Sequence, residues 1–248
     1  MSCAVPLARI RPPPAALALD GPPRARRRRA PLRARFLARP NRFVAEVELA
    51  GGARAIAHLA NPGRLTGTLT PRCALLLDGP HPGRRCEYTV LAAREGRTWV
   101  GTVTTYANRI FPALWRGGLF PELAGATLAA EVVHGRSRFD FAVDGAFVEV
   151  KSVTLAAGGV ARFPDAVTAR GARHCDELGR LARRGAPVAV VFVAQRGDVE
   201  AVEPEDDVDP VFGAALRRAA DRGVRVLACA LDLAPGGPRR VRRIPVRL

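Results

Sequence analysis

The chain has 248 residues, enough for one large domain or two small ones, each with a core of its own. Its formal net charge of +16 favours a polyanionic partner, nucleic acid first, although GC-rich coding DNA would also make a protein rich in Arg. Aromatic residues make up only 6%, so base-stacking platforms are few. Because no apolar run reaches the ~20 residues that a membrane-spanning helix needs, we expect no membrane partner.

The five cysteines are scattered along the chain at Cys3, Cys73, Cys86, Cys175 and Cys229. None belongs to a Cys-x-x-Cys pair or is spaced from a His as in zinc sites, so structural zinc is not expected. An unpatterned, odd set of thiols is typical of a reducing compartment, and we expect a cytoplasmic protein. The sequence leaves the oligomeric state open.

Residues 1–30 are rich in Pro, Arg and Ala and contain the run Arg26–Arg29. They show no apolar periodicity and are therefore predicted to form a disordered basic tail. The prolines between Leu7 and Leu19 argue against a signal peptide. A tail that touches DNA and a misassigned start codon are both open explanations.

Residues 31–103 contain short apolar runs separated by Gly and Pro, which predicts a small β-domain. Five or so strands in this length favour a closed OB-type barrel, a fold that often binds oligonucleotides, and a purely structural barrel is the alternative. The runs are Arg35–Leu49, Arg54–Ala60, Ala74–Leu77, Glu87–Ala93 and Thr98–Val103, the last two around Glu95-Gly96.

Residues 104–248 alternate between helical and strand patterns, so we predict an α/β (α+β) domain. Pro187–Ala194 is continuously apolar, as a strand buried on both faces should be. A hairpin between residues 138 and 153 is expected near the middle of the sheet. The predicted helices are 108–116, 166–184 and 209–222, and the predicted strands are 127–133, 138–143, 146–153, 187–194 and 224–230.

The hairpin is centred on Asp144-Gly145, the strongest short hairpin signal, because both turn positions need positive φ. A two-residue turn fixes the register and places Asp140 opposite Glu149, and Arg138 opposite Lys151. Side chains alternate along a strand, so these four are expected on one face. The opposite face is expected to be a core of Phe139, Phe141, Val143, Val148 and Val150.

Two carboxylates facing each other repel, and a divalent cation such as Mg²⁺ or Mn²⁺ would offset that repulsion. Lys151 could then hold an attacking water or a developing phosphate charge. Among 39 basic residues Lys151 is the single Lys, which suggests that Arg cannot replace it there. The alternative is an ordinary half-buried hairpin with Asp140 and Glu149 in solvent.

Other residues are weaker candidates. Glu131 precedes the hairpin and could add a third carboxylate, or lie in solvent. Asn61 is expected in a turn and Asn108 as a helix N-cap. His174 shares a helix face with Arg170 and is expected to be an ordinary surface histidine. We expect phosphate contacts from Arg42, Arg64, Arg138 and Arg170.

An Asp on one strand with Glu-x-Lys on the next resembles the PD-(D/E)xK nuclease-like fold, with Phe139 in place of the Pro. The chain is also similar to the sugar fermentation stimulation protein A family from about residue 31 to its end. The matching segments are Arg39-Pro-Asn-Arg-Phe-Val-Ala, Asn61-Pro-Gly-Arg, Ala107-Asn-Arg, Ser137-Arg-Phe-Asp-Phe, Val148-Glu-Val-Lys-Ser-Val-Thr-Leu and Phe163-Pro-Asp-Ala-Val-Thr-Ala-Arg-Gly.

The resemblance implies an N-terminal OB-type domain, a C-terminal nuclease-like domain, DNA more than RNA as the partner, and a role in regulating sugar (maltose) utilisation. It implies that Asp140 and Glu149, with Glu131 in a matching segment, bind metal and that Lys151 assists catalysis. Two functions follow: a Mg²⁺-dependent nuclease, and a DNA-binding regulator that keeps the nuclease fold without turnover.

Overall fold

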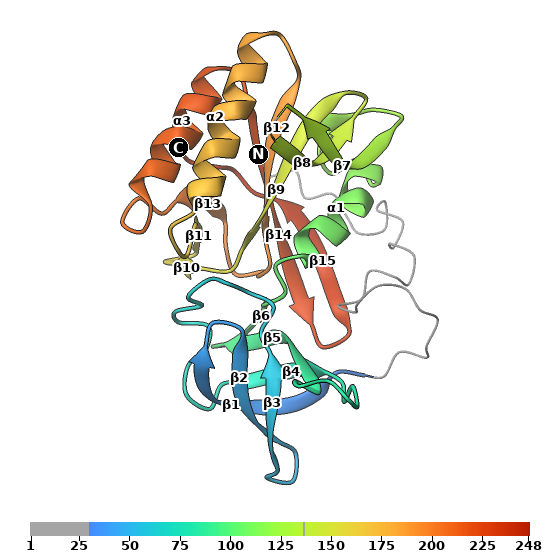
Figure 1. Ribbon diagram of the computed structural model, residues 1–248, viewed down its shortest axis with the longest axis vertical. Helices are drawn as coiled ribbons and strands as arrows, with labels where there is room; N and C mark the ends of the chain where they lie inside the picture. The colour runs from blue at the N-terminus through green and yellow to red at the C-terminus, as the bar shows by residue number, and fades with distance from the viewer. Residues whose placement is uncertain (1–29, 136) are drawn as a thin grey trace.

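The structure is a computed structural model that describes residues 30–135 and 137–248 (Figure 1). The tail predicted for residues 1–30 lies outside this part, apart from Ala30. The described chain forms a small β-barrel followed by a mixed α/β domain, which confirms the predicted fold class. Among the residues described, no helix has both the length and the apolar character to cross a membrane.

The barrel is built from the first five strands, β1 (Leu32–Asn41), β2 (Val44–Leu49), β3 (Arg54–His58), β4 (Ala74–Asp78) and β5 (Tyr88–Glu95). They run in the order β3-β2-β1-β4-β5, and β3 pairs with β5 to close the barrel. Its interior is apolar and includes Phe36, Val47, Leu75 and Val90. The closed barrel thus has one continuous core.

The single run predicted over Arg35–Leu49 is two strands, β1 and β2. The side chain of Asn41 accepts a hydrogen bond from the Phe43 backbone N–H at 2.9 Å, which stabilises the turn between them. An Asx turn of this kind reverses the chain without a glycine, so the apolar alternation alone did not reveal it.

The second domain begins after β6 (Thr98–Gly101), which pairs with β5 of the barrel and with Leu233 of the second domain. Its elements are α1 (Tyr106–Arg116), η2 (Pro121–Leu123), β7 (Leu128–His134), β8 (Ser137–Val143), β9 (Ala146–Val153), β10 (Ala156–Ala157), β11 (Val160–Phe163), α2 (Ala169–Arg183), β12 (Val188–Ala194), β13 (Ala201–Pro204), α3 (Pro210–Asp221), β14 (Arg225–Ala234) and β15 (Gly237–Arg243).

The large sheet continues from β6 in the order β14-β12-β9-β8-β7. Strand β12 is parallel to both neighbours and all seven of its residues are buried, as the apolar run predicted. In this order β9 is the central strand and β8 lies next to the edge strand β7, so the β8–β9 hairpin begins beside the edge and reaches the middle of the second domain's sheet, as predicted. Strand β15 extends the sheet beyond β14.

Helices cover both faces of this sheet (Figure 1). On one face α1 contributes Ile110, Phe111 and Leu114 to a core that reaches the barrel through Leu91 and Trp99. On the other face α2 and α3 pack over β12 and β14. Strand β9 therefore has one helix layer on each side.

Helix α2 was predicted from residue 166, but it begins at Ala169 because Thr168 is its N-cap and accepts a hydrogen bond from Gly171 N at 3.1 Å. Strand β15 was missed altogether. Four of its seven residues are Arg, and only Val241 of its hydrophobic residues turns inward, so no alternating apolar pattern is visible. Gly185 and Gly223 end α2 and α3 at positive φ, as predicted.

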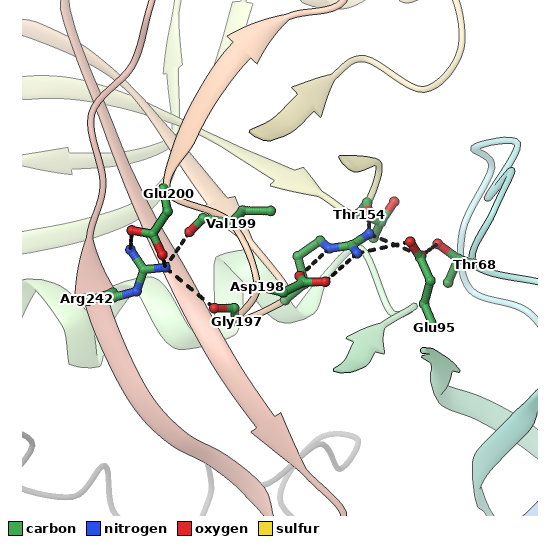
Figure 2. A network of polar contacts seen from close by, with 9 residues as sticks. Thr68, Glu95, Thr154, Gly197, Asp198, Val199, Glu200 and Arg242 are labelled. Atoms are coloured by element: carbon green, nitrogen blue, oxygen red, sulfur yellow. Dashed lines mark hydrogen bonds and ion pairs between the residues drawn. The ribbon is translucent and has the colours of Figure 1, made fainter. Parts of the chain in front are cut away.

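A buried arginine joins the two domains. Arg196 is only 3% exposed and donates hydrogen bonds to Glu95 of the barrel, to Asp198 and to the Thr154 carbonyl. Thr68 in turn donates to Glu95 at 3.0 Å. Figure 2 shows this network running from Asp198 and Thr154 across to Glu95 and Thr68. This network around Arg196 therefore fixes the barrel against the end of β9.

Candidate active site

The hairpin forms with the predicted register. Asp144 and Gly145 have φ of 44° and 86°, and Val143 pairs with Ala146. Regular pairing continues only as far as Phe141 and Val148. At the next position, Asp140 accepts a hydrogen bond from the Val150 backbone N–H at 2.8 Å through Oδ2. The Asp140 carboxylate thus takes the place of a backbone acceptor where the two strands separate.

The prediction of one continuous core face on β8 was wrong. Phe141 belongs to the core under α1, whereas Phe139 packs on the α2 side against Phe147. The break coincides with Glu131 of the neighbouring strand, which has a φ of 55° and interrupts the β7–β8 pairing opposite Asp140. Phe139 and Phe141 are both buried, but in cores on opposite sides of the sheet.

Glu149 lies 4% exposed on β9. Its Oε1 receives two donors, Lys151 Nζ and His174 Nδ1, each at 2.6 Å. Burial raises the pKa of Glu149, but the hydrogen bond from His174 and the charge of Lys151 outweigh it, so the pKa lies below its ordinary value. Oε2 is buried and has no hydrogen-bond partner in residues 30–135 and 137–248. The carboxylate is thus charged and has one oxygen unused.

Asp140 has the opposite electrostatic character. Burial and the nearby charge of Glu149 raise the pKa of Asp140, against the lowering effects of the Val150 N–H, Lys151 and Asn108. Asn108 Nδ2 donates to Asp140 Oδ1 at 2.6 Å. The structure therefore brings the three residues of the predicted site together and leaves one of its carboxylates destabilised as an anion.

Two predicted roles were wrong and prove to be contacts of the site. Asn108 lies inside α1, whose N-cap is Thr105, and its side chain faces Asp140 and not the helix end. His174 is 3% exposed and not a surface residue. A signal for His174 is present in the sequence, since it falls on the buried face of α2 with Gly171 and Leu178.

Glu131 does not join the two carboxylates. Its side chain is 67% exposed and lies 3.2 Å from the guanidinium of Arg138, also an exposed residue. This pair lies on the outer strands β7 and β8. Glu131 therefore stays a solvent-facing residue in this structure, the alternative that the sequence had left open.

Arg42, Arg64 and Arg170 are exposed, as residues that meet phosphate must be. Sequence reasoning missed how two of them are held. The Arg39 guanidinium donates to four backbone carbonyls, including those of Arg42 and Arg64, while the Asn61 side chain accepts from Gly63 N at 2.9 Å in the predicted turn. The β1–β2 turn and the 61–64 loop are therefore one unit of the barrel.

That unit touches the second domain at Asp165. A Cβ on Gly63 would meet the Asp165 carboxylate at 2.0 Å, so only glycine allows this approach. Burial raises the pKa of Asp165, and the charges of Arg39 and Arg64 act against it. Asp165 lies just before α2, the helix that carries His174 and Arg170. The contact therefore relates the barrel arginines to the site helix.

The carboxylate oxygens of Asp140 and Glu149 fit a divalent cation. No group of three or more His, Cys, Asp or Glu residues gathers in residues 30–135 and 137–248. Mg²⁺, however, is commonly held by one or two carboxylates with water and phosphate completing its shell. The buried, unpartnered Oε2 of Glu149 and the destabilised anion of Asp140 are what such an ion would satisfy.

Comparison with known proteins places the chain in a family. Residues 37–102 match the SfsA N-terminal OB domain, and residues 105–237 match the Sugar fermentation stimulation protein RE domain. The sugar fermentation stimulation protein homolog of Symbiobacterium thermophilum is 41% identical over 238 residues, 88% of this chain and 95% of the relative. That of Moorella thermoacetica is 41% identical over 211 residues, 81% and 90% of the two chains.

A solved structure, that of Pyrococcus furiosus SfsA in complex with Ca²⁺, has a TM-score of 0.79 and 28% identity to this chain. The likeness covers 88% of this chain and 96% of the archaeal one. Both domains are thus matched by sequence, and nearly the whole described chain is matched by structure. The chain belongs to the sugar fermentation stimulation protein family.

Proposed function

We propose that the protein is a divalent-metal-dependent phosphodiesterase that hydrolyses nucleic acid, DNA more than RNA. Asp140 and Glu149 hold the metal, Mg²⁺ or Mn²⁺, and Lys151 assists the reaction at the phosphate. This set of residues resembles the site of the PD-(D/E)xK nuclease-like fold. Asn108 and His174 complete the site as hydrogen-bond donors to the two carboxylates.

The observation that carries the proposal is the state of Glu149. A buried carboxylate normally satisfies both oxygens, yet within the described part of the chain Oε2 of Glu149 has no partner while Oε1 has two. Asp140 lies close enough for the charge of Glu149 to raise its pKa. A buried, repelling pair with a free oxygen is costly in a site with only a structural role.

The chemistry of such a site is divided among its parts. A divalent cation held by Asp140 and Glu149 would act as a Lewis acid toward water and the phosphate. Lys151 Nζ, now 2.6 Å from Glu149 Oε1, would supply a compact positive charge to the phosphate. The relative from Pyrococcus furiosus, solved in complex with Ca²⁺, supports a cation site in this family.

The partner follows from charge. The net charge of +16 favours a polyanion, and the exposed Arg42, Arg64, Arg138 and Arg170 offer guanidinium groups to phosphate. Arg170 is in the first turn of α2, on the helix that also carries His174. The barrel arginines are tied to the same helix region through Gly63 and Asp165.

The direct test is incubation of the purified protein with labelled single- and double-stranded DNA and RNA, with Mg²⁺, Mn²⁺ or EDTA. Cleavage that needs the metal and disappears in Asp140→Asn supports the proposal. Binding without cleavage under every metal condition would overturn it.

The second candidate is a DNA-binding regulator of sugar (maltose) metabolism genes that keeps the nuclease fold without turnover. The names of the curated relatives favour it, since they describe stimulation of sugar fermentation. The low exposure of Lys151, whose side chain is 12% accessible and bound to Glu149, is the structural feature in its favour. Metal-independent binding to specific DNA sequences would distinguish this function.

A further inference from the structure

We propose that His174 is a positioning residue that holds the Glu149 carboxylate on its own, so that Lys151 can leave Glu149 for the phosphate of a bound substrate. The inference rests on the proposed function and adds a residue to it. It begins with the unequal hydrogen bonding of the Glu149 carboxylate, whose Oε1 has two donors and whose Oε2 has none among the residues that the structure describes.

The two donors differ in their freedom to move. Lys151 reaches Glu149 from two residues along the same strand, on a flexible four-carbon chain. His174 reaches it from α2, is 3% exposed, and packs edge-on against Phe139 with ring centroids 5.9 Å apart. The imidazole of His174 is therefore fixed by packing, whereas the Lys151 side chain can move its ammonium group away from Glu149.

The position of His174 is also fixed by its helix. Thr168, the N-cap of α2, donates its backbone N–H to Asp209 at 2.7 Å. Asp209 is the N-cap of α3 and accepts from Phe212 N at 2.9 Å. One buried carboxylate thus joins the starts of both helices. His174, one turn into α2, is held relative to the sheet by this joint.

The consequence lies in what happens when Lys151 moves. Without His174, departure of Lys151 would leave the 4%-exposed Glu149 with no donor on either oxygen, a strongly unfavourable state for a buried charge. With His174 in place, Oε1 keeps one hydrogen bond and the carboxylate keeps its orientation. Oε2 stays available to the cation, as expected for a ligand held by an outer partner.

The single lysine makes this testable without metal or turnover. The purified full chain is acetylated with limiting sulfo-N-hydroxysuccinimide acetate in EDTA, and the rate at Lys151 is followed by mass spectrometry. The N-terminal α-amine, the only other primary amine in the sequence, is the internal reference. His174→Phe keeps a ring of similar size and has no donor, whereas His174→Asn keeps a donor.

We expect the Lys151 rate to fall about fivefold in His174→Phe, because Lys151 becomes the only donor to Glu149 and a net hydrogen bond is worth about this factor. His174→Asn should stay within about twofold of the wild type, well below that factor. An unchanged or faster rate in His174→Phe would overturn the inference, as would a fall in His174→Asn equal to that in His174→Phe. If His174→Phe does not fold, His174→Leu, which also lacks a donor, takes its place in the same comparison.

A second readout is Mn²⁺ binding by titration calorimetry. Loss of the outer partner in His174→Phe should weaken Mn²⁺ binding roughly 10–100-fold, and His174→Asn should restore most of it. Equal Mn²⁺ affinity in wild type and His174→Phe would contradict the positioning role and leave the proposed function intact. A wild type that binds no Mn²⁺ would instead remove the proposed function, while the acetylation rates still decide whether His174 frees Lys151.

Discussion

The Nδ2 of Asn108 donates to Oδ1 of Asp140 at 2.6 Å and thereby ties α1 to the hairpin. On the other face of the sheet, His174 of α2 contacts Glu149 in the same way. Each carboxylate thus has one donor from a different helix layer. The two carboxylates nevertheless differ, because burial and neighbouring charge raise the pKa of Asp140 and the donors of Glu149 lower its pKa.

This difference predicts opposite effects of neutralising each carboxylate in metal-free protein. Asp140→Asn should leave the free energy of unfolding unchanged or raise it by about 1 kcal/mol, because it removes a destabilised charge. Glu149→Gln should lower it by about 1–3 kcal/mol, because two donors lose a charged acceptor. Urea melts in EDTA at pH 7 measure both. A loss of stability in Asp140→Asn equal to that in Glu149→Gln would contradict the assignment.

The pH dependence has a defined sign. A carboxyl group with a raised folded pKa destabilises the fold above that pKa, and the penalty disappears as pH falls through it. The gain of Asp140→Asn over wild type should therefore shrink on acidification from pH 7. For Glu149, whose folded pKa is lowered, the stabilisation present at neutral pH is lost as pH falls through that lower value.

Lys151→Arg tests whether the ammonium serves the reaction or the ion. It keeps the charge but replaces a compact donor by a planar one, so cleavage should fall at least roughly 100-fold, as for loss of a group that stabilises transition-state charge. In Lys151→Ala the cleavage rate should fall by at least the same factor. The shift of melting temperature on adding Mg²⁺ or Mn²⁺ should persist in both. Loss of that shift in Lys151→Ala would show that Lys151 is needed for metal binding.

The sequence revealed the parts of the site that depend on local signals. Asp144-Gly145 fixed the turn, and β9 begins and ends where predicted, because hairpin geometry is set within a few residues. The two donors on the helices, His174 and Asn108, could not be placed at the carboxylates in this way. His174 lies 25 residues from Glu149, and Asn108 lies 32 residues from Asp140, so only the packing of α1 and α2 brings them together.

The failures at Phe139 and β15 have a similar cause. Strict alternation placed Phe139 and Phe141 on one face, but they pack into different cores on either side of the point where the β8–β9 pairing stops. Strand β15 is stabilised by its pairing with β14 and not by an apolar pattern of its own. Both features depend on a neighbouring strand that local patterns do not report.

The hydrogen-bond network between the two domains predicts a large loss of stability when Arg196 is replaced. Arg196→Met removes the guanidinium that joins Glu95, Asp198 and the Thr154 carbonyl and leaves these acceptors without it. Since Glu95 and Asp198 are partly exposed, we expect the free energy of unfolding to fall by about 3 kcal/mol, the lower end of the range for breaking buried pairs.

The matched control is Arg217→Met, which breaks an ion pair with Asp206 whose two side chains are 39% and 45% exposed. The free energy of unfolding should fall by less than about 1 kcal/mol in this variant. Differential scanning calorimetry compares the two variants. Equal effects would mean that Arg196 does not fix the domains to one another.

Gly63→Ala tests the contact between the barrel loop and Asp165. The added Cβ would lie 2.0 Å from the Asp165 carboxylate, so the loop or the side chain must move, at a cost of about 1–3 kcal/mol. Gly236→Ala is the control, because no atom lies within 4 Å of its Cβ position. Chemical denaturation of both variants measures the difference. A Gly63→Ala protein as stable as Gly236→Ala would show that the contact is loose.

The last prediction concerns Glu131, which the sequence offered as a metal ligand and the structure pairs with Arg138 at 3.2 Å. Nucleic acid binding should weaken steeply with salt, and Arg170→Ala should lower the slope of log K against log salt by about 1. Arg138→Ala should lower it less, because Glu131 already competes for that guanidinium. Glu131→Gln should then strengthen binding at low salt by freeing Arg138, and should leave Mn²⁺ affinity unchanged. Fluorescence anisotropy and calorimetry measure the two quantities on one sample, and a fall in Mn²⁺ affinity would return Glu131 to the carboxylate set.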